Sequence, residues 1–255
     1  RILCANFSTM ILYLLSSIFL GQIALCRANG LRNKGSTAEP VKTVVLVESL
    51  CPGCEEFIQT ILVDAYEKLG PSVMELSVIP FGNARIVDAG KQQVECQHGL
   101  GECDGNVYEL CAIQNYPSIE AYLPFLECLT HVLKPGYDNS TIPPCAFKGC
   151  ATKNHMYWPS IAACHETQYF EMLEKASQST PDHEYVPWVT LDGQHVEASD
   201  QFIAQVCDAY AKKGGAYPAC PQSASNNEWL APNKTIKVCT DRKTLTEEAA
   251  LKEIV

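Results

Sequence analysis

The tetrapeptide Cys51-Pro52-Gly53-Cys54 stands where a strand pattern gives way to a helix pattern, and this junction limits the possible folds more than any other feature. Residues 41–50 are rich in β-branched side chains, which predicts a buried strand. Apolar residues then recur at helical spacing as far as Leu69, where Gly-Pro ends the helix. Residues 73–79 predict a second buried strand. A strand, helix and strand of these lengths predict a parallel βαβ unit with a right-handed crossover.

A long middle segment, residues 84–180, carries cysteines and helical patterns but no strand of comparable quality. Helices are expected at 119–133, with a kink at Pro124, and at 161–177. We therefore interpret the segment as a helical insertion that disulfides hold together. Two pairings are predicted by proximity, Cys145 with Cys150 and Cys207 with Cys220, although spacing alone does not fix disulfide connectivity.

Strand character returns after the insertion. Residues 188–191 predict a strand, Asp192-Gly193 a tight turn and 195–197 a short return strand. A last helix is expected to run to Lys213, capped by Ser199 or Asp200. The order β-α-β, helical insertion, β-β-α resembles the thioredoxin arrangement, so the sequence predicts an α/β, thioredoxin-like fold over residues 41–220 with a disulfide-rich helical insertion.

The two ends of the chain differ in composition from the part between them. The apolar run in residues 1–28 has the length of a signal-peptide core, so we expect a removed leader, then a flexible lead-in at 29–40 and a C-terminal tail at 221–255. No second apolar span follows, so no membrane span is expected in the mature chain. Asn139 and Asn233 lie in Asn-X-Thr/Ser sequons and are expected to be glycosylated.

The net charge and the cysteine content restrict the possible functions further. The net charge of −10 argues against nucleic acid as the main partner. Of the fourteen cysteines, twelve follow the expected leader. An even number behind a leader indicates an oxidising compartment and a disulfide framework.

The spacing of Cys51 and Cys54 fits a redox-active dithiol. Cys51 is expected at the N-terminus of the helix, where unpaired backbone N–H groups and the positive end of the helix dipole stabilise a thiolate. It is then the nucleophile that attacks a substrate disulfide. Cys54, one turn into the helix and more shielded, would attack the mixed disulfide and release the reduced substrate.

Two other interpretations of the pair remain open. A zinc site would need further ligands, which Cys96, His98 and Cys103 could supply, although zinc ligand pairs usually lie on turns. Alternatively, the pair could form a permanent structural disulfide.

Pro187 is the second element of the predicted site. It precedes a strand, as does the cis-proline that faces the dithiol in thioredoxin-like proteins. We expect a cis peptide bond between Val186 and Pro187. The backbone at Val186 would then pair with an extended substrate peptide.

Residues 96–111 read CQHGLGECDGNVYELC. This stretch resembles the signature of the gamma-interferon-inducible lysosomal thiol reductases. The fixed positions of the signature are all present, at Cys96, Gln97, His98, Gly99, Glu102, Cys103, Asn106 and Cys111. We expect the stretch to cover one side of the dithiol, its cysteines to form structural bridges, and His98 to be an ordinary polar residue of the loop.

The resemblance implies an enzyme that reduces protein disulfides at acidic pH, in lysosomes or after secretion, with Cys51 and Cys54 as active cysteines. Its partners would be disulfide-containing proteins and a small thiol or other reductant, and neither cofactor nor metal is implied. A secretory-pathway disulfide oxidase or isomerase remains an alternative, because the direction depends on the reduction potential. A disulfide-stapled binding protein without activity is a further alternative.

Overall fold

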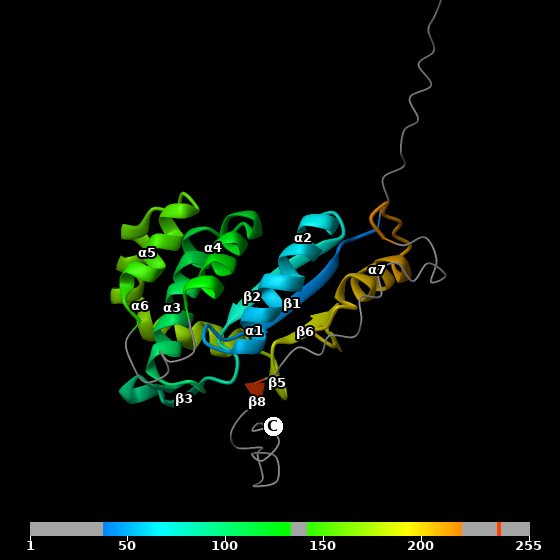
Figure 1. Ribbon diagram of the computed structural model, residues 1–255. Helices are drawn as coiled ribbons and strands as arrows, with labels where there is room; N and C mark the ends of the chain where they lie inside the picture. The colour runs from blue at the N-terminus through cyan, green and yellow to red at the C-terminus, as the bar shows by residue number, and fades with distance from the viewer. Residues whose placement is uncertain (1–37, 134–141, 221–238, 241–255) are drawn as a thin grey trace, which may run out of the picture. The chain divides into compact units, whose positions relative to one another are not determined.

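The computed structural model describes residues 38–133, 142–220 and 239–240 (Figure 1). The expected leader, the tail beyond Thr240, and the sequons at Asn139 and Asn233 lie outside these residues. Within them, no helix is both long enough and apolar enough to span a membrane.

A four-stranded sheet with the order β2-β1-β6-β7 forms the centre of the fold. β1 (Val41–Val47) pairs in parallel with β2 (Met74–Pro80), and β6 (Trp188–Leu191) pairs antiparallel on its other side. β7 (Gln194–Val196) returns along β6. This order confirms the predicted thioredoxin-like arrangement. β1 is central because its side chains are buried on both faces, as its run of β-branched residues predicts.

A continuous helical segment follows Cys51 and joins β1 to β2. It consists of α1 (Pro52–Phe57), a π-helical turn η1 (Ile58–Leu62) and α2 (Val63–Leu69). The segment ends at Gly70, whose φ of 65° favours glycine. Phe57 packs edge to face on Phe202 of the last helix, α7 (Phe202–Lys212), with ring centroids 5.5 Å apart. The helix that begins beside the cysteine pair is therefore anchored in the core.

The predicted helical insertion is present, with one correction. It contains α3 (Leu100–Asn115), α4 (Ile119–Val132), α5 (Pro144–Lys153) and α6 (Trp158–Ser179), and α4 continues through Pro124. However, it opens with an antiparallel hairpin that the sequence did not predict. β3 (Arg85–Asp88) and β4 (Gln93–Glu95) form it around a 3-10 turn, η2 (Ala89–Lys91). These strands have four and three residues and are mostly polar, too short for a periodic signal.

The hairpin after the insertion confirms the turn prediction. Asp192 and Gly193 both have positive φ, at 48° and 81°, as a type I′ turn requires. The cap prediction for the last helix is wrong. Gln201 occupies the N-cap of α7 and makes no side-chain capping bond, and Ser199 Oγ accepts a hydrogen bond from the Gln201 N–H at 3.3 Å.

Four disulfides join described residues, namely Cys96–Cys103, Cys111–Cys164, Cys128–Cys150 and Cys207–Cys220. The last confirms one predicted pair. The predicted Cys145–Cys150 bridge is wrong, because Cys145 is an exposed free thiol. Both residues lie on α5, five positions apart, and at 3.6 residues per turn their side chains leave the helix in different directions. Cys150 faces α4 and bonds to Cys128 there.

Candidate active site

Cys51 lies at the N-cap of α1, in the extended conformation typical of that position. Its Sγ accepts a hydrogen bond from the Cys54 N–H at 3.4 Å, and Pro52 is the first residue of the helix. Pro52 has no N–H to leave unsatisfied there. The structure thus places the Cys51 sulfur at the unpaired amides and the positive end of an anchored helix, as the sequence predicts.

The strand β5 (Tyr185–Val186) faces Cys51 across the site. The carbonyl oxygen of Val186 lies 3.8 Å from Cys51 Sγ, and the Val186–Pro187 peptide bond is cis. The loop before β6 therefore meets the start of α1, although these residues are 135 positions apart in sequence.

The two cysteines differ in state but not in exposure. Neither has any solvent-exposed surface, so the expectation that Cys54 is more shielded than Cys51 is wrong. Cys51 is held in a disulfide, whereas Cys54 is a free thiol. A permanent Cys51–Cys54 bridge is therefore absent from this structure. The zinc interpretation also loses two of its ligands, because Cys96 and Cys103 are bonded to each other.

The signature stretch packs against the loop that leads into Cys51. Asn106 Oδ1 accepts a hydrogen bond from the Ser49 N–H at 2.9 Å, and Ser49 Oγ donates one to the Glu102 carbonyl at 3.1 Å. A Cβ at Gly105 would lie 2.2 Å from Ser49 Oγ, so only glycine permits this close approach. The stretch therefore holds the loop that leads into Cys51.

The remaining signature residues support this contact. Gln97 Oε1 accepts from Asn83 Nδ2 at 2.7 Å, and Gly99 begins α3 with a φ of 89°. Cys103 and Cys111 are both in disulfides, which confirms their expected structural role.

A group of buried carboxylates beside Cys54 was missed by sequence reasoning. Glu48, Glu102 and Glu109 are at most 5% exposed, and Glu55 is half-buried. His98 Nδ1 lies 2.5 Å from Glu102 Oε2 and 3.5 Å from Glu48 Oε2, so His98 takes part in a carboxylate pair rather than standing alone in the loop. One sequence signal was available. Glu102 and Glu109 are seven residues apart and share a helix face.

The three side chains of Glu48, His98 and Glu102 have ligand atoms within 4.8 Å of one another, close enough to hold a metal ion. The hydrogen bond between His98 and Glu102 accounts for their proximity, and Glu48 Oε1 already accepts from the Asn83 N–H at 2.6 Å. We therefore interpret the group as a hydrogen-bonded acid cluster.

Burial and this cluster both disfavour ionisation of the Cys54 thiol. Burial raises the pKa of Cys54 well above its usual value, and the charges of Glu48, Glu102 and Glu109 raise it further. Burial and the neighbouring carboxylates raise the pKa of Glu109 to about 8, and burial raises that of Glu55 to about 7. Both acids are therefore largely neutral at acidic pH, and neutral Glu109 no longer opposes a thiolate at Cys54.

Replacement of Glu109 by glutamine should weaken the pH dependence of stability. The folded protein holds a proton on Glu109 up to about pH 8, whereas the unfolded chain loses it near 4.5. The stability that protonated Glu109 contributes is thus fully present below pH 4.5 and is lost as the pH rises to about 8. We expect the free energy of unfolding of the wild type to fall by on the order of 2 kcal/mol between about pH 5 and about pH 7 from this residue.

Denaturant unfolding at the two pH values checks this expectation. Glu109→Gln should lose less stability across the interval than the wild type does. Glu127→Gln makes the same substitution on the neighbouring helix α4, is the matched control and should keep the wild-type dependence. An unchanged pH dependence in Glu109→Gln would contradict the assignment.

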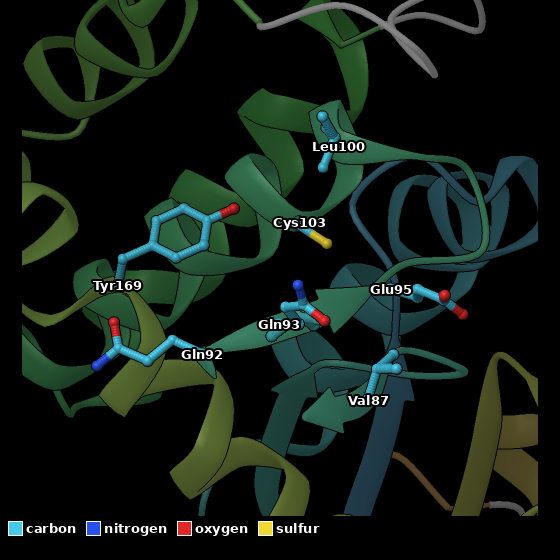
Figure 2. Close-up of a pocket in the computed structure, with 8 residues that line it drawn as sticks. Val87, Gln92, Gln93, Glu95, Leu100, Cys103 and Tyr169 are labelled. Carbon is cyan, nitrogen blue, oxygen red and sulfur yellow. The ribbon is translucent and has the colours of Figure 1, made fainter. Parts of the chain in front are cut away.

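A separate pocket of about 330 Å³ opens beside the Cys96–Cys103 bridge. Figure 2 shows Gln93 and Glu95 of β4, Leu100 and Cys103 near the start of α3, and Tyr169 of α6 around it. Neither Cys51 nor Cys54 lines this pocket. The cysteine pair is instead covered, at the junction of α1 and β5.

The site is thioredoxin-like. It combines a cysteine at the N-terminus of a helix, a second thiol one turn later and a cis-proline loop on the opposite side. Two solved structures share the fold. The DsbA of Chlamydia trachomatis has a TM-score of 0.51 and 18% identity over 69% of this chain and 91% of its own. BdbD of Bacillus subtilis has a TM-score of 0.50 and 14% identity over 70% of this chain and 90% of its own. The fold and the site together define this chain as a thiol-disulfide oxidoreductase.

The family follows from sequence comparison. Residues 42–154 match the model of the gamma interferon inducible lysosomal thiol reductase (GILT) family. A gamma-interferon-responsive lysosomal thiol protein of Arabidopsis thaliana is 34% identical over 72% of this chain and 77% of its own length. The gamma-interferon-inducible lysosomal thiol reductase of Carassius auratus is 32% identical over 72% of this chain and 74% of its own length. The chain belongs to the GILT family.

Proposed function

We propose that this oxidoreductase reduces disulfide bonds of protein substrates, with Cys51 as the nucleophile and Cys54 as the resolving thiol. The observation that carries the proposal is the place of Cys51 Sγ, between the helix N-terminus and the Val186 carbonyl. The helix end favours the thiolate. The backbone before Pro187 offers hydrogen-bonding groups to an extended peptide.

The reaction divides into two exchanges. The Cys51 thiolate attacks one sulfur of the substrate disulfide, and the other substrate sulfur leaves and takes up a proton. Cys54 then attacks Cys51, which releases the second substrate sulfur and leaves a Cys51–Cys54 disulfide. A small thiol or other external reductant restores the dithiol.

We propose acidic working conditions, in lysosomes or outside the cell, because of the acid cluster. At about pH 5 an ordinary thiol is almost entirely protonated, so a working thiol needs help from its surroundings. The raised pKa of Glu109 leaves this side chain neutral there, which removes one negative charge that opposes ionisation of Cys54. Nine cysteines of the described residues are held in disulfides, and these bonds and the expected sequons at Asn139 and Asn233 fit an oxidising route to either destination.

An insulin-reduction assay at about pH 5 and about pH 7 tests the proposal, with the protein first reduced by a dithiol and then freed of it. We expect reduction of insulin at both values and a greater rate relative to the uncatalysed reaction at the acidic one. A protein whose reduced form fails to reduce insulin, but whose oxidised form introduces disulfides into a reduced substrate, would instead be an oxidase. A protein with neither activity would be a binding protein.

A further inference from the structure

Asn83, in the loop between β2 and β3, joins three segments of the candidate site. Its backbone N–H donates to Glu48 Oε1 at 2.6 Å, in the loop that leads into Cys51. Its side-chain Nδ2 donates to Gln97 Oε1 of the signature stretch at 2.7 Å. Its Oδ1 lies 3.2 Å from Nε2 of His183, which is 100 residues further along the chain. Asn83 therefore connects the loop of the proposed nucleophile with the segment that leads into β5.

His183 faces an oxygen atom with each of its two ring nitrogens. Nδ1 lies 2.9 Å from the carbonyl oxygen of Pro181, and Nε2 lies 3.2 Å from Asn83 Oδ1. Both oxygens are acceptors, since the Asn83 amide uses its Nδ2 to donate to Gln97. A neutral imidazole has one N–H to donate, whereas an imidazolium has two. His183 therefore completes both hydrogen bonds only in its charged form.

The segment that His183 anchors forms the wall of the site opposite Cys51. Val186 follows His183 by three residues, and its carbonyl oxygen lies 3.8 Å from Cys51 Sγ. The backbone here is the part proposed above to pair with a substrate peptide. Holding such a segment in place before a ligand arrives lowers the entropy that binding must cost. The contact of His183 with Asn83 is therefore placed to affect substrate binding more than the exchange chemistry.

The charged groups around His183 are compatible with a cation there. The titratable groups on the segments that meet at this point are Asp182, Glu184 and Tyr185 beside His183, Glu48 and Arg85 near Asn83, and His98 beside Gln97. Arg85 is paired with Glu95 at 2.8 Å, and His98 with Glu102 at 2.5 Å. The other charged groups are carboxylates, which attract an imidazolium. Histidine side chains change charge between about pH 5 and pH 8, the interval that separates acidic from neutral compartments.

We propose that His183 is a positioning residue for substrate binding by this reductase. As an imidazolium it joins the segment before Pro187 to Asn83, and through Asn83 to the loop before Cys51. At acidic pH this link holds Val186 ready for a protein substrate. When His183 loses its charge, one of its two hydrogen bonds is lost and the segment is held less firmly. The inference rests on the proposed function, which assigns the Val186 backbone to substrate binding.

Insulin reduction by His183→Asn, at about pH 5 and about pH 7.5, tests this role. The asparagine amide can replace ring Nδ1 beside Pro181 but is too short to reach Asn83. We expect the KM for insulin to rise about tenfold at the acidic value, with kcat changed less than about twofold. At the higher value KM should stay near that of the wild type. Reduction of cystine, which has no peptide segment to pair with Val186, should be unaffected at both.

His131→Asn makes the same substitution at an exposed histidine in the last turn of α4 and is the matched control. It should keep the wild-type KM at both pH values. An equal rise of KM at the two values in His183→Asn, or a fall in kcat alone, would overturn the proposed role, since a merely structural contact would not follow the charge of the ring.

Nitrogen NMR of the histidine rings gives a second readout that needs no activity. At about pH 5 both ring nitrogens of His183 should carry protons, and the signal is assigned by its absence in His183→Asn. Its Nε2–H should exchange with water more slowly in the wild type than in Asn83→Ala, which lacks the acceptor. A neutral ring at this pH, or equal exchange in the two proteins, would contradict the link. If the wild type failed to reduce insulin, the proposed function would fall, and this measurement alone would decide the link.

Discussion

Cys51→Ser should abolish disulfide reduction, with a fall in rate of roughly three orders of magnitude or more, because a serine hydroxyl in the same place is not ionised at working pH and does not attack disulfides. Cys51 makes one described contact across the site and caps α1. Serine is itself a good N-cap residue, so the helix and the fold should be kept.

An insulin-reduction assay on the pre-reduced variant measures this loss, and far-ultraviolet circular dichroism checks the fold. Cys145→Ser is the matched control, because it removes an exposed thiol away from α1. Its activity should equal that of the wild type. Activity retained in Cys51→Ser would show that another group attacks the substrate, and the proposed mechanism would fail.

The second large effect concerns the bridge between α3 and α6. Cys111 and Cys164 are 53 residues apart in sequence, and their disulfide closes the longest loop among the four described bridges. By loop-closure entropy, its removal in the double variant Cys111→Ser/Cys164→Ser should cost about 4 kcal/mol of unfolding free energy. Because α3 carries Asn106 and Glu102, which hold Ser49, this bridge also supports the loop before Cys51.

Urea unfolding of the double variant measures the cost. Cys145→Ser should stay within about 0.5 kcal/mol of the wild type, as surface substitutions usually do. The Cys207–Cys220 disulfide closes a loop of 13 residues, so the double variant Cys207→Ser/Cys220→Ser should lose about 3 kcal/mol. If the Cys111–Cys164 variant lost less than about 1 kcal/mol, the bridge would not hold the insertion together.

The sheet and the cysteine pair could be predicted because their signals are local. The β-branched run of β1, the glycine at position 70 and the Asp192-Gly193 turn each act over a few residues. The Cys51 cap and the cis bond before Pro187 followed from their places at the ends of predicted strands.

Apart from the helix face that Glu102 and Glu109 share, the acid cluster could not be predicted, because it forms through tertiary contact. Glu48 follows β1, and no local pattern marks a carboxylate that packing will bury. The same holds for the partner of Cys150, since the face of α5 that meets α4 depends on how the two helices pack. The pairing of β8 (Cys239–Thr240) with β5 joins residues too far apart for periodicity to show.

The acid cluster acts on the proposed reaction through Cys54. The buried carboxylates that raise the pKa of this thiol slow its attack on the proposed mixed disulfide at Cys51. Protonation of Glu109 on acidification weakens that effect. Acidic compartments would therefore favour turnover.

The most direct test of the central claim is the mixed disulfide that Cys51 forms with a substrate. The variant Cys54→Ser, reduced beforehand and freed of the reductant, lacks the resolving thiol, so a disulfide-containing protein should remain attached. Peptide mapping of the isolated conjugate should find the substrate cysteine linked to Cys51. Attachment at Cys145 alone, or no conjugate with a substrate that the wild type reduces, would contradict the assignment of Cys51 as the nucleophile.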